Sequence, residues 1–240
     1  IKEKSEKILP SLYEKIGMYK KAAQMMEAYA KAHPKESESI DYLYNAAVIQ
    51  DGMNWFKSAT TNYQQYFDKS RSADKHDTLF LLGKLWERRG GITKASEYYS
   101  RFYKSPTKNE SAVVEAAFRT SEIYGKKRKK AERENWLERT VASQRALSSK
   151  GEKVGIRFAA EAKFELVRQT FDELIRIKIP TNPTRQKAAI EKKLALLNKL
   201  REELKSVIVY DDGPMVVASL TLIGQANQHM AASIYGVPTP

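Results

Sequence analysis

The chain has 240 residues, 42% of them hydrophobic and 30% charged, and no run approaches the roughly 18 apolar residues of a membrane span. The absence of cysteine excludes disulfides, thiolate metal sites and cysteine nucleophiles. A formal net charge of +13 predicts attraction to acidic partners (nucleic acid, anionic lipid, acidic protein or cell-wall polymer), although lysines that only solubilise the surface explain it equally well.

Residues 3–107 are predicted to form three successive pairs of antiparallel helices. The first pair covers residues 3–34 and closes at Pro34. The second pair begins near Ser37, turns at Gly52-Met53-Asn54 and returns over Trp55–Lys69. These boundaries carry the Ser, Gly, Asn and Pro residues that start or end helices.

The third pair, Leu79–Tyr103, is joined at Gly90-Gly91 and shows the helical pattern most clearly. Apolar or small residues recur at one-face spacing on both helices, as Leu79, Leu82, Gly83 and Trp86 and then as Ala95, Tyr99 and Phe102. A small residue on each helix, Gly83 and Ala95, is expected to let the two backbones approach closely.

The same pattern recurs with a period in the mid-thirties. A shift of 36 residues places Ala95, Tyr99 and Phe102 on Ala59, Tyr63 and Tyr66, and a further 37 places them on Ala22, Met26 and Tyr29. Two helices in a period of this length indicate a helical repeat array. We therefore expect Ala22, Ala59 and Ala95 to be buried at close helix contacts.

These repeats resemble the tetratricopeptide (TPR) repeat. The matching residues are Gly17, Tyr19, Ala22, Met26 and Pro34 in the first pair, and Leu82, Gly83, Trp86, Gly90, Ala95, Tyr99 and Phe102 in the third. The second pair matches more loosely, and Arg71 replaces the family proline. The resemblance implies an all-α fold, a right-handed superhelix (α-solenoid) of antiparallel helix hairpins.

Residues 108–150 are predicted to form a degenerate fourth pair. Its first helix begins at Asn109, and Trp136, Leu137 and Val141 contribute to the apolar face of the second. The turn between them, Lys126–Lys130, reads KKRKK. Such a run is typical of a nucleic-acid or localisation patch, but we favour a solvated turn because no second cluster of that density flanks it.

Residues 151–240 are predicted to extend the solenoid with long helices. One ends before Pro180, the next covers Thr184–Val207 and the last covers Met215–Tyr235. The middle helix carries Ile190, Leu194, Leu197, Leu200 and Leu204 in heptad-like order, which favours a coiled-coil-like hairpin with its neighbour. On the last helix Ala218, Leu222, Gly224, Gln225 and Met230 are expected to face inward.

This C-terminal part also resembles the end of TPR proteins from deltaproteobacterial cell envelopes, some of them associated with gliding motility. The resemblance covers about residues 158–240, and its residues include Glu161, Phe164, Lys199, Gly224, His229, Pro238 and Pro240. It implies a periplasmic or cell-envelope location and a parent chain that continues past Pro240. A cytoplasmic location is the alternative.

No catalytic or metal-binding motif is present in the sequence. His33, His76 and His229 are far apart and none lies in a ligand spacing such as HExxH. There is no GxSxG, P-loop or GxGxxG motif, and Gly90-Gly91 is a turn. We therefore expect no enzyme activity, no cofactor and no metal.

The resemblance to TPR proteins places the partner on the inner wall, which the first helix of each pair lines in that family. On this chain the wall offers an apolar patch of Tyr44, Val48 and Phe80, bordered by Lys84 and Arg88. Such a patch suits an extended or helical peptide with apolar anchors and an acidic flank. The hypothesis requires the Tyr44 and Phe80 rings to be accessible; packing across adjacent helices is an equal alternative.

One known TPR binding mode is not expected here. Family members that grip a C-terminal carboxylate use a set of Lys, Asn and Arg residues on the wall. Only Lys7 and Asn45 match that set, because Ser11, Asp77 and Leu81 occupy its other places.

The sequence therefore predicts a non-enzymatic scaffold that binds a protein or peptide in a concave groove, in a bacterial envelope assembly. An acidic partner on the basic surface is a further possibility. Two alternatives stay open, a solenoid that binds nucleic acid, which we do not favour, and an α-superhelical module of a larger cell-wall enzyme.

Overall fold

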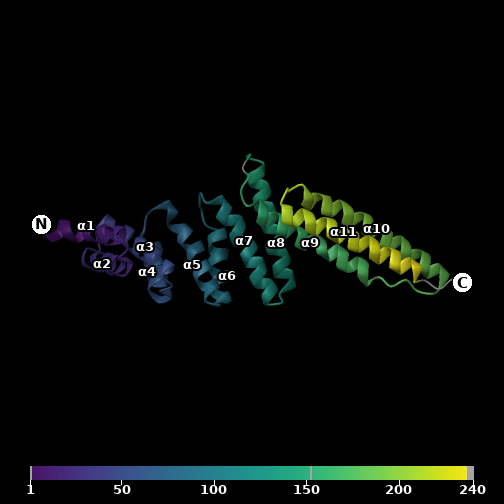
Figure 1. The fold of residues 1–240 in the computed structure, drawn as a ribbon, viewed down its shortest axis with the longest axis horizontal. Helices are drawn as coiled ribbons and strands as arrows, with labels where there is room; N and C mark the ends of the chain where they lie inside the picture. Colours follow the sequence, from purple (N-terminus) through teal and green to yellow (C-terminus); the bar gives the residue numbers. More distant parts are fainter. Residues whose placement is uncertain (1, 152, 237–240) are drawn as a thin grey trace. The chain divides into compact units, whose positions relative to one another are not determined.

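A computed structural model describes residues 2–151 and 153–236, with side chains from Ser5 onward, and their regular structure is entirely helical (Figure 1). The helices are α1 (Lys2–Lys15), α2 (Tyr19–Ala32), α3 (Ser37–Gly52), α4 (Phe56–Lys69), the 3-10 helix η1 (Ala73–His76), α5 (Asp77–Arg88), α6 (Ile92–Tyr103), α7 (Glu110–Lys126), α8 (Lys130–Ser148), α9 (Ile156–Arg176), α10 (Pro183–Ile208) and α11 (Gly213–Tyr235).

The chain divides into two compact units, an N-terminal unit (Ile1–Asn109) and a C-terminal unit (Glu110–Pro240). The division lies two residues beyond the predicted end of the third pair, and no division falls at residue 150. Pro238 and Pro240, which support the envelope resemblance, lie outside the described residues.

The N-terminal unit consists of helix hairpins stacked in chain order. Helices α1 and α2, α3 and α4, and α5 and α6 pair with each other, while α2 packs on α3 and α4 on α5. Each helix therefore contacts its neighbours in sequence, which is the arrangement that a repeat array requires. The prediction of antiparallel helix hairpins is confirmed.

Four inter-helix turns share one backbone geometry. Gly17, Asn54, Gly90 and Arg128 have φ values of 75°, 60°, 77° and 56°. The amide of each following residue donates to the carbonyl five residues earlier, as from Met18 to Tyr13 (2.8 Å) and from Lys129 to Tyr124 (3.0 Å). This is the hydrogen bond of the Schellman motif that ends a helix. The repeat thus extends to the fourth hairpin, where an arginine takes the left-handed position.

The predicted small residues lie at the helix contacts. Ala22, Ala59 and Ala95 are fully buried, as expected. A Cβ on Gly83 would lie 2.6 Å from two carbons of the Tyr99 ring, so only glycine allows α5 to approach α6 this closely. The expectation of close backbone approach in this pair is confirmed.

In the C-terminal unit, the α7–α8 hairpin packs on α9, and α9, α10 and α11 contact one another. Figure 1 shows these last three helices side by side. Their shared core includes Val167, Leu174, Leu197, Leu200, Leu204 and Leu222. Each long helix thus buries its apolar face against two others, where the sequence predicted a hairpin.

The two faces predicted in this bundle are mostly buried as expected, as at Leu200 on α10 and Leu222 on α11, but each is wrong at one place. On α10, Leu194 is 44% exposed, and Lys193 is fully buried in its place. On α11, Gly224 and Gln225 are exposed, whereas Ser219 and Ala226 are buried. The inward stripe follows the groove between the other two helices, and spacing alone does not locate that groove.

Candidate functional site

The five predicted partner-binding residues lie on α3 and α5 of the N-terminal unit. Tyr44 and Val48 are one turn apart on α3, and Phe80, Lys84 and Arg88 are one turn apart on α5. Arg88 forms an ion pair with Asp51 on α3, so the two helices are joined at one end of this wall. We call these five residues the α3/α5 wall.

Tyr44 is half-buried among the rings of α4. Its ring centroid lies 5.1 Å from that of Tyr66 and 6.0 Å from that of Tyr63. Burial, with smaller contributions from Tyr66 and Asp77, raises the pKa of Tyr44 above its ordinary value. The wall therefore presents a partly exposed phenol that stays neutral.

Phe80 is not part of the accessible surface. It is only 8% exposed, and its ring packs against Tyr99 (5.7 Å between centroids) and Phe102 (5.4 Å). The Lys84 ammonium lies 5.6 Å from the Phe80 centroid. The expectation of an accessible Phe80 is wrong, because α6 supplies two aromatic rings that complete the core around it.

The remaining wall residues are accessible. Val48 is 44% exposed, and the Arg88 side chain is 55% exposed although it is paired with Asp51. The wall therefore offers one aliphatic side chain, one phenol edge and two cationic side chains to a partner.

A small pocket of about 280 Å³ continues the wall at its Arg88 end. It is lined by Asp51, Asn54, Phe56, Leu85, Arg88 and Arg89. The Arg89 guanidinium lies 5.1 Å from the Phe56 ring centroid, and Phe56 meets Trp86 edge-on at 4.8 Å. Two guanidinium groups next to apolar side chains suit an Asp or Glu side chain. Its carboxylate can pair with the guanidinium groups while its methylene groups pack against the apolar side chains.

The sequence contained signals for this pocket that the wall hypothesis did not use. Arg88 and Arg89 end α5 directly before the Gly90 turn, and Phe56 begins α4 after the turn at Asn54. Repeated turns bring such residues together when adjacent hairpins stack, so the arginines at the end of α5 and the phenylalanine at the start of α4 were the signal for this pocket.

In the first hairpin, Lys7 is paired with acidic side chains of the same chain. Lys7 lies 2.9 Å from Glu36 and 3.3 Å from Glu38, and the Tyr29 hydroxyl donates to Glu36 (2.5 Å). Hydrogen bonds from Lys7 to Glu36, and then contacts with Tyr29 and Glu38, raise the pKa of Lys7. The single cation that matches the carboxylate-gripping mode is therefore engaged within the chain.

The three histidines are dispersed in the structure. His33 contacts Glu6 and Glu36, His76 lies against the Phe67 ring, and His229 lies 3.0 Å from the ammonium of buried Lys193. Within residues 2–151 and 153–236, no three His, Asp or Glu side chains are grouped as metal ligands. None of the described helices has the length and apolar character to cross a membrane.

No known protein-family profile matches the chain, and no curated protein matches its sequence. Among solved structures, the chain is similar to BtubC (BKLC) of P. vanneervenii, with 16% identity over 95% of this chain and 94% of that chain, and a TM-score of 0.46.

Two crystal structures of a Podosopora anserina protein described as a kinesin light chain with nearly identical TPR-like repeats are also similar. They are 14% and 15% identical over 83% and 82% of this chain and 96% and 95% of theirs, with TM-scores of 0.47 and 0.46. These likenesses assign neither a family nor a function, and the fold rests on the helix pairing described above.

Proposed function

We propose that the N-terminal unit is a non-enzymatic scaffold that binds a protein segment along the α3/α5 wall. The segment carries an apolar residue against Tyr44 and Val48 and, one or two helical turns away, an acidic residue in the Arg88–Arg89 pocket. The observation that carries this proposal is the pocket itself, because two arginines and an apolar floor lie beside an exposed aliphatic side chain.

Both chemical components of this segment follow from the contacts. Asp51 neutralises only part of the cationic charge that Arg88, Arg89 and nearby Lys84 bring to this end of the wall. A partner carboxylate completes the pairing, and guanidinium groups bind it in a planar, two-pronged geometry. The apolar component covers Val48, which would otherwise remain open to water.

The test is selection of a displayed peptide library on the protein, followed by measurement of the affinity of the enriched peptides. We expect enrichment of an apolar residue and an acidic residue at fixed spacing. Arg89→Glu or Val48→Glu then weakens binding more than tenfold, about 1.4 kcal/mol. The control is Lys57→Glu, a comparable charge reversal at an exposed site of α4. Equal effects of Arg89→Glu and Lys57→Glu would exclude the wall as the binding site.

We also propose that the scaffold works in a bacterial envelope assembly. Support comes from the resemblance of residues 158–240 to envelope TPR proteins, some of them associated with gliding motility. Fractionation of the native cell tests this location, with periplasmic recovery as the expected result and recovery in the cytoplasm as the contrary one.

A further inference from the structure

The α7–α8 turn keeps a charged residue where the backbone favours glycine. Arg128 has a φ of 56°, and the equivalent positions in the other three hairpins hold Gly17, Asn54 and Gly90. A long side chain in the left-handed region carries a conformational cost that glycine avoids. Arg128 therefore places a charged side chain of the KKRKK run at a backbone position that glycine would occupy with less strain.

The cations of this turn surround a hollow of about 390 Å³. Lys126, Arg128, Lys129, Lys130 and Arg133 line it against a single acid, Glu122. Lys129 is paired with Glu132 at 3.3 Å. In the part of the chain that the structure describes, no acidic side chain pairs with Lys126, Arg128 or Lys130.

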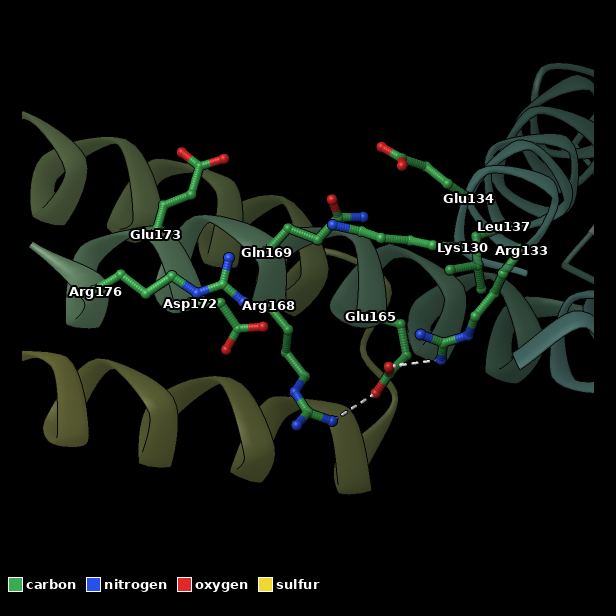
Figure 2. Close-up of a pocket in the computed structure, with 10 residues that line it drawn as sticks. All are labelled: Lys130, Arg133, Glu134, Leu137, Glu165, Arg168, Gln169, Asp172, Glu173 and Arg176. Carbon is green, nitrogen blue, oxygen red and sulfur yellow. Dashed lines mark hydrogen bonds and ion pairs between the residues drawn. The ribbon is translucent and has the colours of Figure 1, made fainter. Parts of the chain in front are cut away.

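A second space of about 340 Å³ lies between α8 and α9 (Figure 2) and shares Lys130 and Arg133 with the hollow. We call the two spaces together the α8/α9 groove. Glu165 lies between Arg133 (2.7 Å) and Arg168 (3.0 Å). Burial acts to raise the pKa of Glu165, but hydrogen bonds from these two arginines outweigh it and hold the pKa below its ordinary value.

The far end of the groove carries more acidic than basic side chains. Asp172 and Glu173 lie on the last turn of α9 together with Arg176, whereas Glu134 on α8 lies near Lys130. Figure 2 shows Asp172 and Glu173 beside Arg176, at the opposite end of the space from Lys130 and Arg133. The groove is therefore dipolar, with unpaired cations at the α7–α8 turn and, at the end of α9, two carboxylates beside one guanidinium group.

We infer that the α8/α9 groove binds a protein segment of opposite polarity, with acidic residues over the α7–α8 turn and a basic residue near Asp172 and Glu173. A nucleic acid carries negative charge uniformly along its backbone, so its phosphates would meet the acidic end as well as the basic end. Complementary charge at both ends fixes the direction of a peptide and excludes the reverse orientation. This site lies in the C-terminal unit and is independent of the α3/α5 wall.

The experiment measures fluorescence anisotropy with four labelled probes at about 50 and 300 mM salt. The probes are a 14-residue peptide with four Glu at one end and two Lys at the other, its scrambled form, an all-acidic peptide and single-stranded (dT)14. We expect the dipolar peptide to bind at least tenfold tighter than its scramble and than (dT)14, with weakening at high salt. Equal binding of the scramble, no peptide binding, or tighter binding of (dT)14 would each overturn the inference.

The variant Arg128→Gly distinguishes a loss of peptide binding from a loss of folding stability. Because glycine suits the left-handed position, the variant is expected to melt at a higher temperature while it binds the dipolar peptide at least threefold more weakly. The double variant Asp172→Lys with Glu173→Lys is expected to bind the dipolar peptide more weakly and the all-acidic peptide more tightly. The control, Lys187→Gln with Lys192→Gln on the exposed side of α10, removes two positive charges away from the groove. If the control variant loses as much affinity for the dipolar peptide as Arg128→Gly does, the binding depends only on the overall positive charge, and the proposed site is refuted.

Discussion

The close contact between α5 and α6 at Gly83 gives a specific prediction for Gly83→Ala. The added methyl would lie 2.6 Å from Cδ1 and Cε1 of Tyr99. The ring cannot move aside easily, because Tyr99 is fully buried, packs against Phe80 and donates its hydroxyl to Glu87 at 2.8 Å. Helix α5 must therefore shift away from α6, or Tyr99 must leave its position.

Two opposing effects set the magnitude. Alanine is favoured over glycine inside a helix by about 1 kcal/mol, whereas one extra methyl in a well-packed core costs about 1–3 kcal/mol. The difference is a net loss of about 0–2 kcal/mol, and we expect the upper part of this range because the Tyr99 ring is held in place. For a domain of about 100 residues, which is close to the size of the N-terminal unit, the melting temperature falls by roughly 4–8 °C for each kcal/mol of lost stability.

The matched control is Gly52→Ala, in the same unit. Gly52 is the last residue of α3, its φ is not positive, and no heavy atom lies within 4 Å of a Cβ built there. This variant is expected to be as stable as the unchanged protein or slightly more stable.

Urea unfolding, followed by hydrogen exchange of peptides from α5 and α6, measures the difference and locates it. If Gly83→Ala proves as stable as Gly52→Ala, the packing of Tyr99 over Gly83 is refuted. The inferred register of the third hairpin then fails with it.

Three further predictions concern other contacts. Ala95→Leu should lower the free energy of unfolding by about 1–3 kcal/mol through overpacking and speed hydrogen exchange in the adjacent hairpin; an unchanged melting temperature would contradict this. Burial, and then the charge of Lys193, lowers the pKa of His229. Its contribution to stability is therefore full above the unfolded-state pKa of about 6.5 and is lost as pH falls through the lower folded-state pKa. Urea unfolding at pH 7.5 and 5.5 should show that loss in the C-terminal unit, and His229→Gln should reduce it. Arg133→Ala should raise the pKa of Glu165, measured by NMR titration, because it removes the 2.7 Å ion pair; an unmoved titration would show that Arg168 alone holds the carboxylate.

The sequence alone determined the hairpins of the N-terminal unit. Helix faces and ends depend on residues within a few positions of each other, so Ala22, Ala59 and Ala95 and the predicted turns at Gly52-Met53-Asn54 and Gly90-Gly91 were sufficient. The fourth turn was also expected at Lys126–Lys130, but the sequence did not indicate that Arg128 adopts the left-handed conformation there.

Only the tertiary structure decided which side chains reach the surface and which stay inside. Successive helical residues differ by about 100° around the axis, so a stripe of leucines allows two neighbouring registers. On α10 the groove between α9 and α11 selected the register that buries Lys193. Its ammonium is satisfied there by the Ile177 carbonyl, the Ser233 hydroxyl and His229, all at 3.0 Å.

The same holds for the candidate sites. Phe80 became core because α6 covers it, and Arg89 joined Phe56 because two turns meet at the end of adjacent hairpins. The dipolar groove likewise depends on α8 lying against α9 with a particular offset. Spacing along one helix identifies the side chains that share a face, but a site forms from the faces of several helices, and their relative offset is a property of packing.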